Sequence, residues 1–483
     1  MTLARRLDAS VALVAAAAHA GVLRNGFAVD DVAIAANPLL QRVATLPAAM
    51  AAPWWHPDPH LYRPLATLMI GAELLLAHGA AWLPHLVNVA LHAGIAVLVS
   101  QLARRWLQPI AAAGAGACFA LLPAHAEAVG TIVGQAELLA AAALMGTMLV
   151  VTRVAAPTPR SRLAVLVLAV VALASQEGGV TAPVLALGAA WALPRARPYA
   201  WTNAFAALAG IVVLLLARLI VLGTLGGDRA HPAFRTLGPW RRLVAATSML
   251  PHSAAMLLLP VPPAINYVPP WQSVLHPSPG ALLVGVMLVA GGLALLVAHV
   301  RHPSVTTLGA LIVAVTLAPT ANLLFASGVA VSGRGMYAPS IGTALLSGAL
   351  LAALARRAPS VAGIVATGYL LACAVVTVRE GPVWRSSASA LAAAEARGPD
   401  SYWVPRGRAY LARDAGRPAE ALGYFRRAAT LMPVDWEMLT DGATVALAAH
   451  DTVDAERWLA AAVAAHPGTG RARVRLDALR RTR

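Results

Sequence analysis

The sequence has no lysine and few acidic residues for its length. Only 12% of its 483 residues are charged, which is about half the share that is usual in soluble domains. Ten of the 21 acidic residues lie in the first 380 positions, and the other eleven lie in the last 103. These absences exclude a soluble fold for most of the chain and indicate a soluble C-terminal tail.

Cysteine is almost absent too. Cys118 and Cys373, the only two, both lie inside apolar runs, so neither a disulfide framework nor a cysteine metal site is available. Positive charge is carried by arginine, and most arginines lie between apolar runs. This pattern is typical of loop charges that orient a membrane protein rather than of a nucleic-acid-binding surface. We therefore expect contact with membrane lipid and no nucleic-acid partner.

Apolar residues, in contrast, are abundant: 59% of the chain is hydrophobic, and the mean hydropathy is +0.68. A spanning helix needs about 20 mostly apolar residues. Eleven segments approach that length. The first of them is interpreted as a retained span rather than a signal peptide. They are residues 8–24, 85–103, 109–125, 131–152, 163–177, 179–194, 200–222, 281–300, 305–325, 337–355 and 361–379. The sequence thus predicts an all-α, polytopic membrane helical bundle of about 11 spans.

Arginine-rich short loops alternate with these segments, and the positive-inside rule places such loops in the cytoplasm. Eleven spans then put the N-terminus inside and the C-terminus outside. Two long segments face the outer side, namely a first outer loop, 25–84, and a long outer loop, 223–280, with an interfacial helix near 240–259. We expect an integral protein of a cell membrane, with a bacterial inner membrane as its location.

The tail, residues 381–483, contains a repeat with a period of 34 residues. Ala409, Ala421, Phe425, Ala428 and Pro433 recur as Ala443, Ala455, Leu459, Ala462 and Pro467. Small residues at helix contacts, a large apolar residue in the second helix and a closing proline are typical of tetratricopeptide (TPR) repeats. The sequence therefore predicts a membrane domain, 1–380, and a soluble TPR domain, 381–483, with two repeats, 401–435 and 436–470. The TPR pair either binds a peptide or protein partner or serves only as a structural lid.

Ionisable side chains inside or at the mouth of apolar spans are costly and usually functional. In the predicted topology, several groups of polar residues lie at the outer face. They are Asp30 with Asp31; Tyr62 with Arg63; His85 with Asn88 and His92; His125 with Glu127, Gln135 and Glu137; Ser175 with Glu177; and Arg334 with Tyr337. Asn88 and His92 also have a structural interpretation, in which they join helices by hydrogen bonds. His125 and Glu127 are candidates for a divalent metal or a phosphate-linked headgroup, and the sequence leaves the need for a metal open.

These motifs follow one another across residues 26–342, and in this order, with TPR repeats beyond them, the chain resembles membrane O-mannosyltransferase-like proteins. That family is related to the protein O-mannosyltransferases and falls within the C-type glycosyltransferase (GT-C) superfamily. The motifs that carry the resemblance include Gly26-Phe27, Asp30-Asp31, Tyr62-Arg63-Pro64-Leu65, His125-Ala126-Glu127, Ser175 with Glu177, and Arg334 with Tyr337. The chain departs from the family pattern at Gln176, where lysine is usual, and at Gly333, where glutamate is usual.

The resemblance implies a GT-C fold and an integral-membrane glycosyltransferase. Such an enzyme moves a sugar, here mannose or another hexose, from a polyprenyl-phosphate carrier to a protein or glycan hydroxyl on the non-cytoplasmic face. A carboxylate in the first outer loop acts as the base, which places it at Asp31 or Asp30. The candidates for the donor phosphate are Arg334, His85, His125, Arg63 and Tyr337, and the supporting residues are Glu127, Glu137, Glu177 and Asn88. The lipid-linked sugar is a substrate, and the cofactor is unknown apart from the open question of a divalent cation.

Asp30 and Asp31 are adjacent, so on an extended loop only one of them points toward a substrate. Asn37-Pro38 ends the segment and leaves Asp31 nearer the turn, which favours Asp31 as the base and Asp30 as structural. General-base help of this kind is worth about 10²–10⁴-fold in rate. The alternative is that the pair caps a short helix starting at Val32, since aspartate is a favoured N-cap.

Two other classes of function remain open. A non-catalytic membrane scaffold would recruit a partner through the TPR pair, but it would not need the Asp30-Asp31 pair. A transporter or flippase of a lipid-linked glycan would be expected to show internal repeats and broken helices near the middle of the membrane. No internal symmetry is visible among the predicted spans, and the acids cluster at the outer face. The sequence therefore favours the transferase over both alternatives.

Overall fold

The computed structural model describes residues 2–55, 61–153, 156–225, 230–324 and 326–481. Over these residues the chain is all-α, and the described backbone contains no β-strand, only an isolated bridge between Tyr267 and Val331. The predicted all-α class is therefore confirmed.

The helices of the first half are α1 (Leu3–His19), α2 (Asp30–Ala35), α3 (Leu46–Met50), α4 (Pro64–Leu76), α5 (Trp82–Ala103), α6 (Pro109–Leu121), α7 (Ala126–Gly130), α8 (Gln135–Arg153), α9 (Pro159–Ser175), α10 (Ala182–Trp191) and α11 (Ala200–Leu222). Three of them, α2 to α4, lie within the segment expected as the first outer loop, 25–84. Proline stands at the start of α4, α6 and α9, where its missing N–H costs no helical hydrogen bond.

The second half begins with the long outer loop and ends with the tail. Its helices are α12 (Pro232–Arg235), α13 (Pro239–Leu258), α14 (Trp271–Leu275), α15 (Pro279–Ala298), α16 (Val305–Leu317), α17 (Tyr337–Arg357), α18 (Pro359–Glu380), α19 (Ser387–Arg397), α20 (Trp403–Asp414), α21 (Pro418–Leu431), α22 (Trp436–Ala448), α23 (Thr452–Ala465) and α24 (Gly470–Arg481). The helix expected near 240–259 is α13, which has a proline, Pro251, in its interior.

Seven helical segments among the described residues are long and apolar enough to cross a membrane. They are Leu3–Arg24, Trp82–Ala103, Gln135–Arg153, Arg197–Leu222, Pro279–Ala298, Arg334–Arg357 and Pro359–Arg385. A bent pair, Pro109–Leu121 with Pro123–Gly130, meets at 47° and makes an eighth if it crosses as one span. The chain is therefore an integral membrane protein.

The predicted number of spans is not confirmed. Three of the expected spans coincide with shorter helices, since α9 has 17 residues, α10 has 10 and α16 has 13. At 1.5 Å per residue, a helix of 10 residues is about 15 Å long, about half the thickness of the hydrocarbon layer. The count of about eleven stays a prediction.

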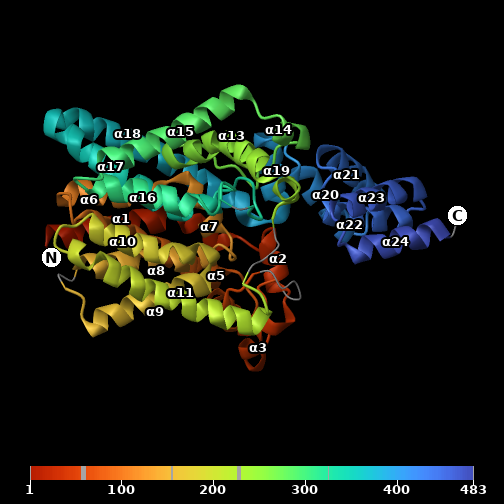
Figure 1. Ribbon diagram of the computed structural model, residues 1–483, viewed down its shortest axis with the longest axis horizontal. Helices are drawn as coiled ribbons and strands as arrows, with labels where there is room; N and C mark the ends of the chain where they lie inside the picture. The colour runs from red at the N-terminus through yellow and green to blue at the C-terminus, as the bar shows by residue number, and fades with distance from the viewer. Residues whose placement is uncertain (1, 56–60, 154–155, 226–229, 325, 482–483) are drawn as a thin grey trace.

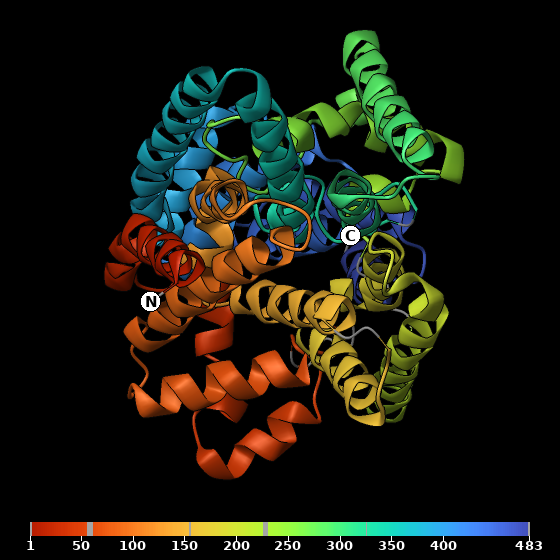
Figure 2. The same cartoon turned by 90° about the vertical axis from the view of Figure 1, so that its left-hand side faces the viewer.

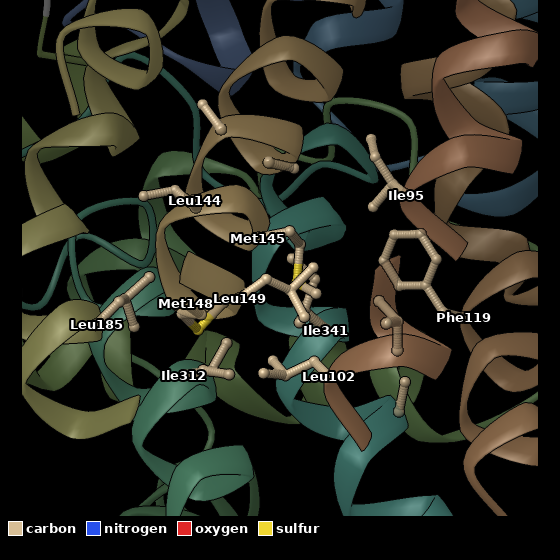
Figure 3. Close-up of a cluster of buried hydrophobic side chains, with 14 of the residues drawn as sticks. Ile95, Leu102, Phe119, Leu144, Met145, Met148, Leu149, Leu185, Ile312 and Ile341 are labelled. Carbon is tan, nitrogen blue, oxygen red and sulfur yellow. The ribbon is translucent and has the colours of Figure 1, made fainter. Parts of the chain in front are cut away.

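Small residues bring the spans into close contact at the core of the bundle. A Cβ atom added to Gly342 in α17 would lie 2.3 Å from the backbone oxygen of Gly309 in α16, so these two helices pack backbone to backbone. Larger side chains from α5, α6, α8 and α17 fill the adjoining space, among them Ile95, Phe119 and Met145 (Figure 3). Such small-residue contacts are the usual basis of helix association in lipid.

The periphery of the bundle is apolar and exposed. In the most apolar stretch of 18 residues in α15, only 6% is buried. The corresponding stretch of Pro359–Arg385 is 17% buried. Seen along the long axis of the bundle, α15 lies at its outer edge (Figure 2). Exposed faces of this composition suit contact with lipid chains.

The C-terminal helices form a separate block at one end of the bundle, opposite the N-terminus (Figure 1). Successive helices from α20 to α24 pack against one another, and the repeated positions are buried, including Ala409, Phe425 and Leu459. The block is attached to the long outer loop: the amide of Tyr402 donates to the oxygen of Val268 at 3.0 Å. These helix pairs have the period that TPR repeats require, and the TPR assignment itself stays a prediction.

Candidate active site

Arg334 joins three segments that are far apart in the sequence. It begins the 3₁₀ turn Arg334–Met336 ahead of α17. Its Nε lies 2.9 Å from Glu127 Oε1, and its Nη2 donates to Asp30 Oδ2 at 2.9 Å. The backbone N–H of Arg334 also donates to Glu127 Oε2, at 3.1 Å. Arg334 thus fixes Asp30 of α2 and Glu127 of α7 relative to each other.

A second arginine, Arg63, makes a bidentate pair nearby. It precedes Pro64 at the start of α4, and its Nε and Nη2 donate to Glu177 Oε2 at 2.9 and 2.6 Å. Its guanidinium carbon lies 5.4 Å from the ring centroid of Trp54, a distance suited to a cation–π contact. The paired hydrogen bonds orient the planar guanidinium group, as lysine could not.

Glu137, in the first turn of α8, connects the two pairs. Its carboxylate interacts electrostatically with both Arg334 and Arg63, and within the described part of the chain its buried Oε2 has no hydrogen-bond partner. We call the six side chains the charge cluster; its members are Asp30, Arg63, Glu127, Glu137, Glu177 and Arg334. Four carboxylates face two arginines here, and each guanidinium group is paired with at least one carboxylate.

The charge cluster is open on one side. The side chains of Asp30 and Glu177 are 36% and 35% exposed, whereas that of Glu127 is 2% exposed. α2, which carries Asp30, lies at the same end of the bundle as the C-terminal helices (Figure 1). Solvent can therefore reach Asp30 and Glu177, while Glu127 is covered.

Asp31 occupies a different environment from Asp30. Its side chain is fully buried and accepts backbone hydrogen bonds from Ala28 at 3.3 Å and Val133 at 3.0 Å. Burial raises the pKa of the Asp31 carboxyl to about 7. These contacts anchor the loop to the start of α8, and they favour Asp30 over the sequence-based choice of Asp31 as the base. The helix α2 starts at Asp30, and its N-cap is Val29, without a side-chain hydrogen bond, so the alternative in which the aspartates cap a helix from Val32 is wrong.

Three residues expected to bind the donor phosphate do not join the charge cluster. His85 is fully buried, and its Nε2 lies 3.3 Å from the oxygen of Gly26. His125 and Tyr337 are buried as well, and His125 Nε2 lies 2.7 Å from Ser340 Oγ. Of the expected donor-binding residues, only Arg334 and Arg63 lie in the cluster.

His125 and Tyr337 belong to a second polar group, which we call the histidine group: His19, His92, His125 and Tyr337. His92 is at its centre, with Nδ1 2.8 Å from the Tyr337 hydroxyl. The ring centroids of His19 and His125 lie 4.7 and 5.1 Å from that of His92. The group joins α1, α5, α17 and the turn before α7, as the structural interpretation of His92 predicted.

The sequence reasoning missed His19. A single polar residue at the end of the first apolar run was the signal available, and it had no charged neighbour to mark it. Asn88, expected as a supporting residue, donates from Nδ2 to the oxygen of Thr131 at 2.7 Å. It therefore holds the chain between α7 and α8 and does not face the charge cluster.

No metal-binding group of three or more His, Cys, Asp or Glu side chains occurs in the described part of the chain. The two residues proposed from the sequence have different partners, since Glu127 binds Arg334 and His125 binds Ser340. Both carboxylate oxygens of Glu127 are thus engaged by Arg334, whereas His125 Nδ1 has no hydrogen-bond partner among the described residues.

The two departures from the family pattern lie beside the charge cluster. A Cβ atom on Gly333 would lie 2.9 Å from the oxygen of Ala124 and 3.2 Å from Glu127 Oε2, so a side chain there would displace Glu127. Gln176 turns back on its own backbone, and its Oε1 accepts the N–H of Gly178 at 2.5 Å. Neither position supplies a charge to the cluster.

Fold and site together define an all-α integral membrane protein with an arginine–carboxylate cluster at one end of its helices. The chain is 27% identical over 380 residues to the mouse protein O-mannosyl-transferase TMTC3, covering 69% of this chain and 41% of that protein. It is 26% identical to the human TMTC3 over 322 residues, or 59% of this chain and 35% of the relative. It is 30% identical to Drosophila melanogaster Tmtc2 over 217 residues, or 41% and 23%.

These matches confirm the resemblance found from the motifs: the chain is similar in sequence to proteins named protein O-mannosyl-transferase. The match spans less than half of each of these relatives. No family model and no solved structure matches the chain.

Proposed function

We propose that this protein is a glycosyltransferase that moves a sugar, mannose or another hexose, from a polyprenyl-phosphate carrier to a hydroxyl of a protein or glycan. The observation that carries the proposal is Asp30, a solvent-accessible carboxylate whose position is set by a mostly buried arginine, Arg334. The names of the relatives point to the same reaction, because each is called a protein O-mannosyl-transferase.

Asp30 is the general base in this mechanism. As the acceptor oxygen attacks the anomeric carbon, Asp30 takes the hydroxyl proton, and the bond from that carbon to the phosphate oxygen breaks. The electron pair stays with the carrier phosphate, whose growing negative charge is stabilised by Arg334 and Arg63 through charge-assisted hydrogen bonds. Glu127 and Glu177 orient these two guanidinium groups, and Asp31 holds the loop.

We propose the same membrane placement as the sequence predicts, with a cytoplasmic N-terminus and an outer active site in a bacterial inner membrane. The N-terminus and the C-terminal block lie at opposite ends of the bundle (Figure 1), which supports their being on opposite sides of the membrane. The lipid chain of the carrier would lie in the bilayer, with its phosphate at the charge cluster. We further propose that residues 1–380 form the catalytic domain and that the tail, 381–483, carries two TPR repeats that select the protein or glycan acceptor.

The test uses the full chain in lipid vesicles with a polyprenyl-phosphate mannose donor and a hydroxyl-bearing peptide. We expect sugar transfer by the parent and a loss of about 10²–10⁴-fold in Asp30→Asn, because the amide cannot accept the proton. Asp31→Asn is the matched comparison: it changes the neighbouring carboxyl, which holds the loop but is not the base, so it should lower the rate much less than Asp30→Asn does.

If Asp30→Asn transfers sugar at the parent rate, the catalytic assignment is wrong. If the parent binds the donor lipid but transfers nothing to any hydroxyl acceptor, the scaffold function replaces the transferase.

A further inference from the structure

The loop that carries Asp30 contains an unfavourable backbone conformation. Val29 has φ +53° and ψ −112°, and the N–H of Asp31 donates to the oxygen of Ala28 at 3.0 Å to close the turn. This is the first central position of a type II′ turn, which glycine normally occupies. A β-branched residue with positive φ is a true outlier, so the surrounding structure must hold Val29 in place.

The segment that follows the last span makes the contacts that keep Val29 in this conformation. Ser387, the first residue of α19, accepts the N–H of Val29 on its Oγ at 2.8 Å. Two further bonds lie alongside: the N–H of Gly26 donates to the oxygen of Arg385 at 3.2 Å, and Asn25 Nδ2 donates to the oxygen of Gly381 at 3.0 Å. Of these three hydrogen bonds, the one to Ser387 is made by a side chain of α19, whereas the other two are accepted by backbone oxygens. Ser387 binds Val29, the residue directly before Asp30.

The same segment also touches the helix that carries Glu127. Trp384 is 2% exposed, and a Cβ atom on Gly130, at the end of α7, would lie 3.1 Å from the Trp384 Cβ. Residues 381–387 therefore contact both elements whose carboxylates meet at Arg334. A change in residues 381–387 can therefore alter the position of Asp30, although none of these residues is proposed to contact the substrate.

We propose that Ser387 is a positioning residue for the reaction: its hydroxyl holds the strained Val29 peptide so that the Asp30 carboxylate stays against Arg334. The proposal rests on the proposed function, because it assumes that Asp30 is the base. It assigns a role in catalysis to the start of the tail, which the sequence placed outside the membrane domain.

The experiment compares Ser387→Ala with Ser387→Thr in the full chain, using the vesicle assay. We expect kcat to fall about tenfold in Ser387→Ala, the effect of one lost hydrogen bond, with the KM for the donor unchanged. Ser387→Thr keeps the hydroxyl oxygen and should restore most of kcat. Ser386→Ala is the control, because it removes the N-cap of the same helix, whose Oγ accepts the N–H of Ser389, but does not contact the loop.

A second pair of variants tests the strain itself. Glycine occupies positive φ without steric cost, so Ser387→Ala should cost clearly less in a Val29→Gly background than in the parent. Equal costs in both backgrounds would overturn the proposal, and so would a loss of kcat in Ser386→Ala as large as that in Ser387→Ala.

Hydrogen exchange of the amides at residues 26–31 gives a readout that does not depend on turnover. Ser387→Ala should speed exchange in this peptide, and unchanged exchange would contradict the proposed hold. If Asp30→Asn is fully active while exchange responds as expected, the proposed function fails and the hold on the loop stands, so the two failures are distinguishable.

Discussion

The charge cluster and the histidine group place polar side chains among apolar helices in different ways. In the charge cluster, ionic groups meet ionic groups, and Arg334 reaches two carboxylates at 2.9 Å each. In the histidine group, the partners are hydroxyls and rings, as in the 2.8 Å contact between His92 and Tyr337. The first is open at Asp30, and the second is buried throughout.

The difference shows which polar residues of a membrane protein are available for chemistry. A buried charge is tolerated only beside an opposite charge, so arginines and carboxylates lie together in ion pairs. Charged groups of a substrate can interact with the same residues. Uncharged hydrogen-bonding groups are satisfied by a single neighbour and serve to join helices. Four substitutions test this division.

The largest effect on stability is expected for Arg334→Ala. The change leaves Glu127, which is 2% exposed, as an uncompensated buried carboxylate, and removing one partner of a buried pair costs about 3–5 kcal/mol. Thermal unfolding in detergent should show this loss, and donor-lipid binding should fall with it. Unchanged stability would mean that Glu127 has another source of compensation and that the cluster is not an interdependent unit.

The next largest effect concerns the pH dependence of stability. Burial raises the pKa of the Asp31 carboxyl to about 7, above its ordinary value of 3.8, so between these pH values the folded protein holds a proton that the unfolded chain has released. Stability therefore falls as the pH rises from about 4 to about 7 and levels off above that range. Asp31→Asn should remove this part of the slope, which in the parent is worth on the order of 1–4 kcal/mol between pH 4 and pH 8.

The pH series needs melting curves of the parent, Asp31→Asn and Asp30→Asn across pH 4–8. Asp30→Asn is the matched control, because its carboxylate is partly exposed and paired with Arg334. An unaltered slope in Asp31→Asn would show that Asp31 is ionised in the folded protein throughout this range.

A smaller effect on stability is expected for Arg63→Ala. Its partner Glu177 is 35% exposed, so water can take over part of the lost interaction, and the cost should be about 1–2 kcal/mol. Transfer should nevertheless fall strongly, since Arg63 is proposed to stabilise the leaving phosphate. A variant that loses stability but keeps the parent kcat would remove Arg63 from the donor site and leave Arg334 alone there.

The smallest effect is expected in the histidine group. Tyr337→Phe removes the hydroxyl that contacts His92 and should cost about 1 kcal/mol of stability, the usual net value of one hydrogen bond. The transfer rate should stay at the parent level, because Tyr337 does not reach the charge cluster. A tenfold drop in rate without a change in donor KM would erase the distinction between the two groups.

The sequence by itself determined the helices and their membrane character. Long apolar runs, scarce acids and arginine-rich short loops depend only on local composition, and lipid imposes helices on such segments. The same composition marked members of the charge cluster, Asp30, Arg63 and Arg334, because ionisable groups at the ends of spans are few. The span count was less secure, since α10 and α16 are too short to be judged from hydropathy alone.

Only the tertiary structure decided which polar residues meet. Arg334 finds its partners 207 and 304 positions away in the chain, and Val29 finds Ser387 across 358. No local pattern encodes such distances, because they follow from how the spans pack. Asp30 and Asp31 are neighbours with the same side chain, yet packing leaves one accessible beside Arg334 and buries the other against the start of α8. The chemistry available to each aspartate is therefore a property of the folded bundle, where burial and opposing charge are set by residues from distant helices.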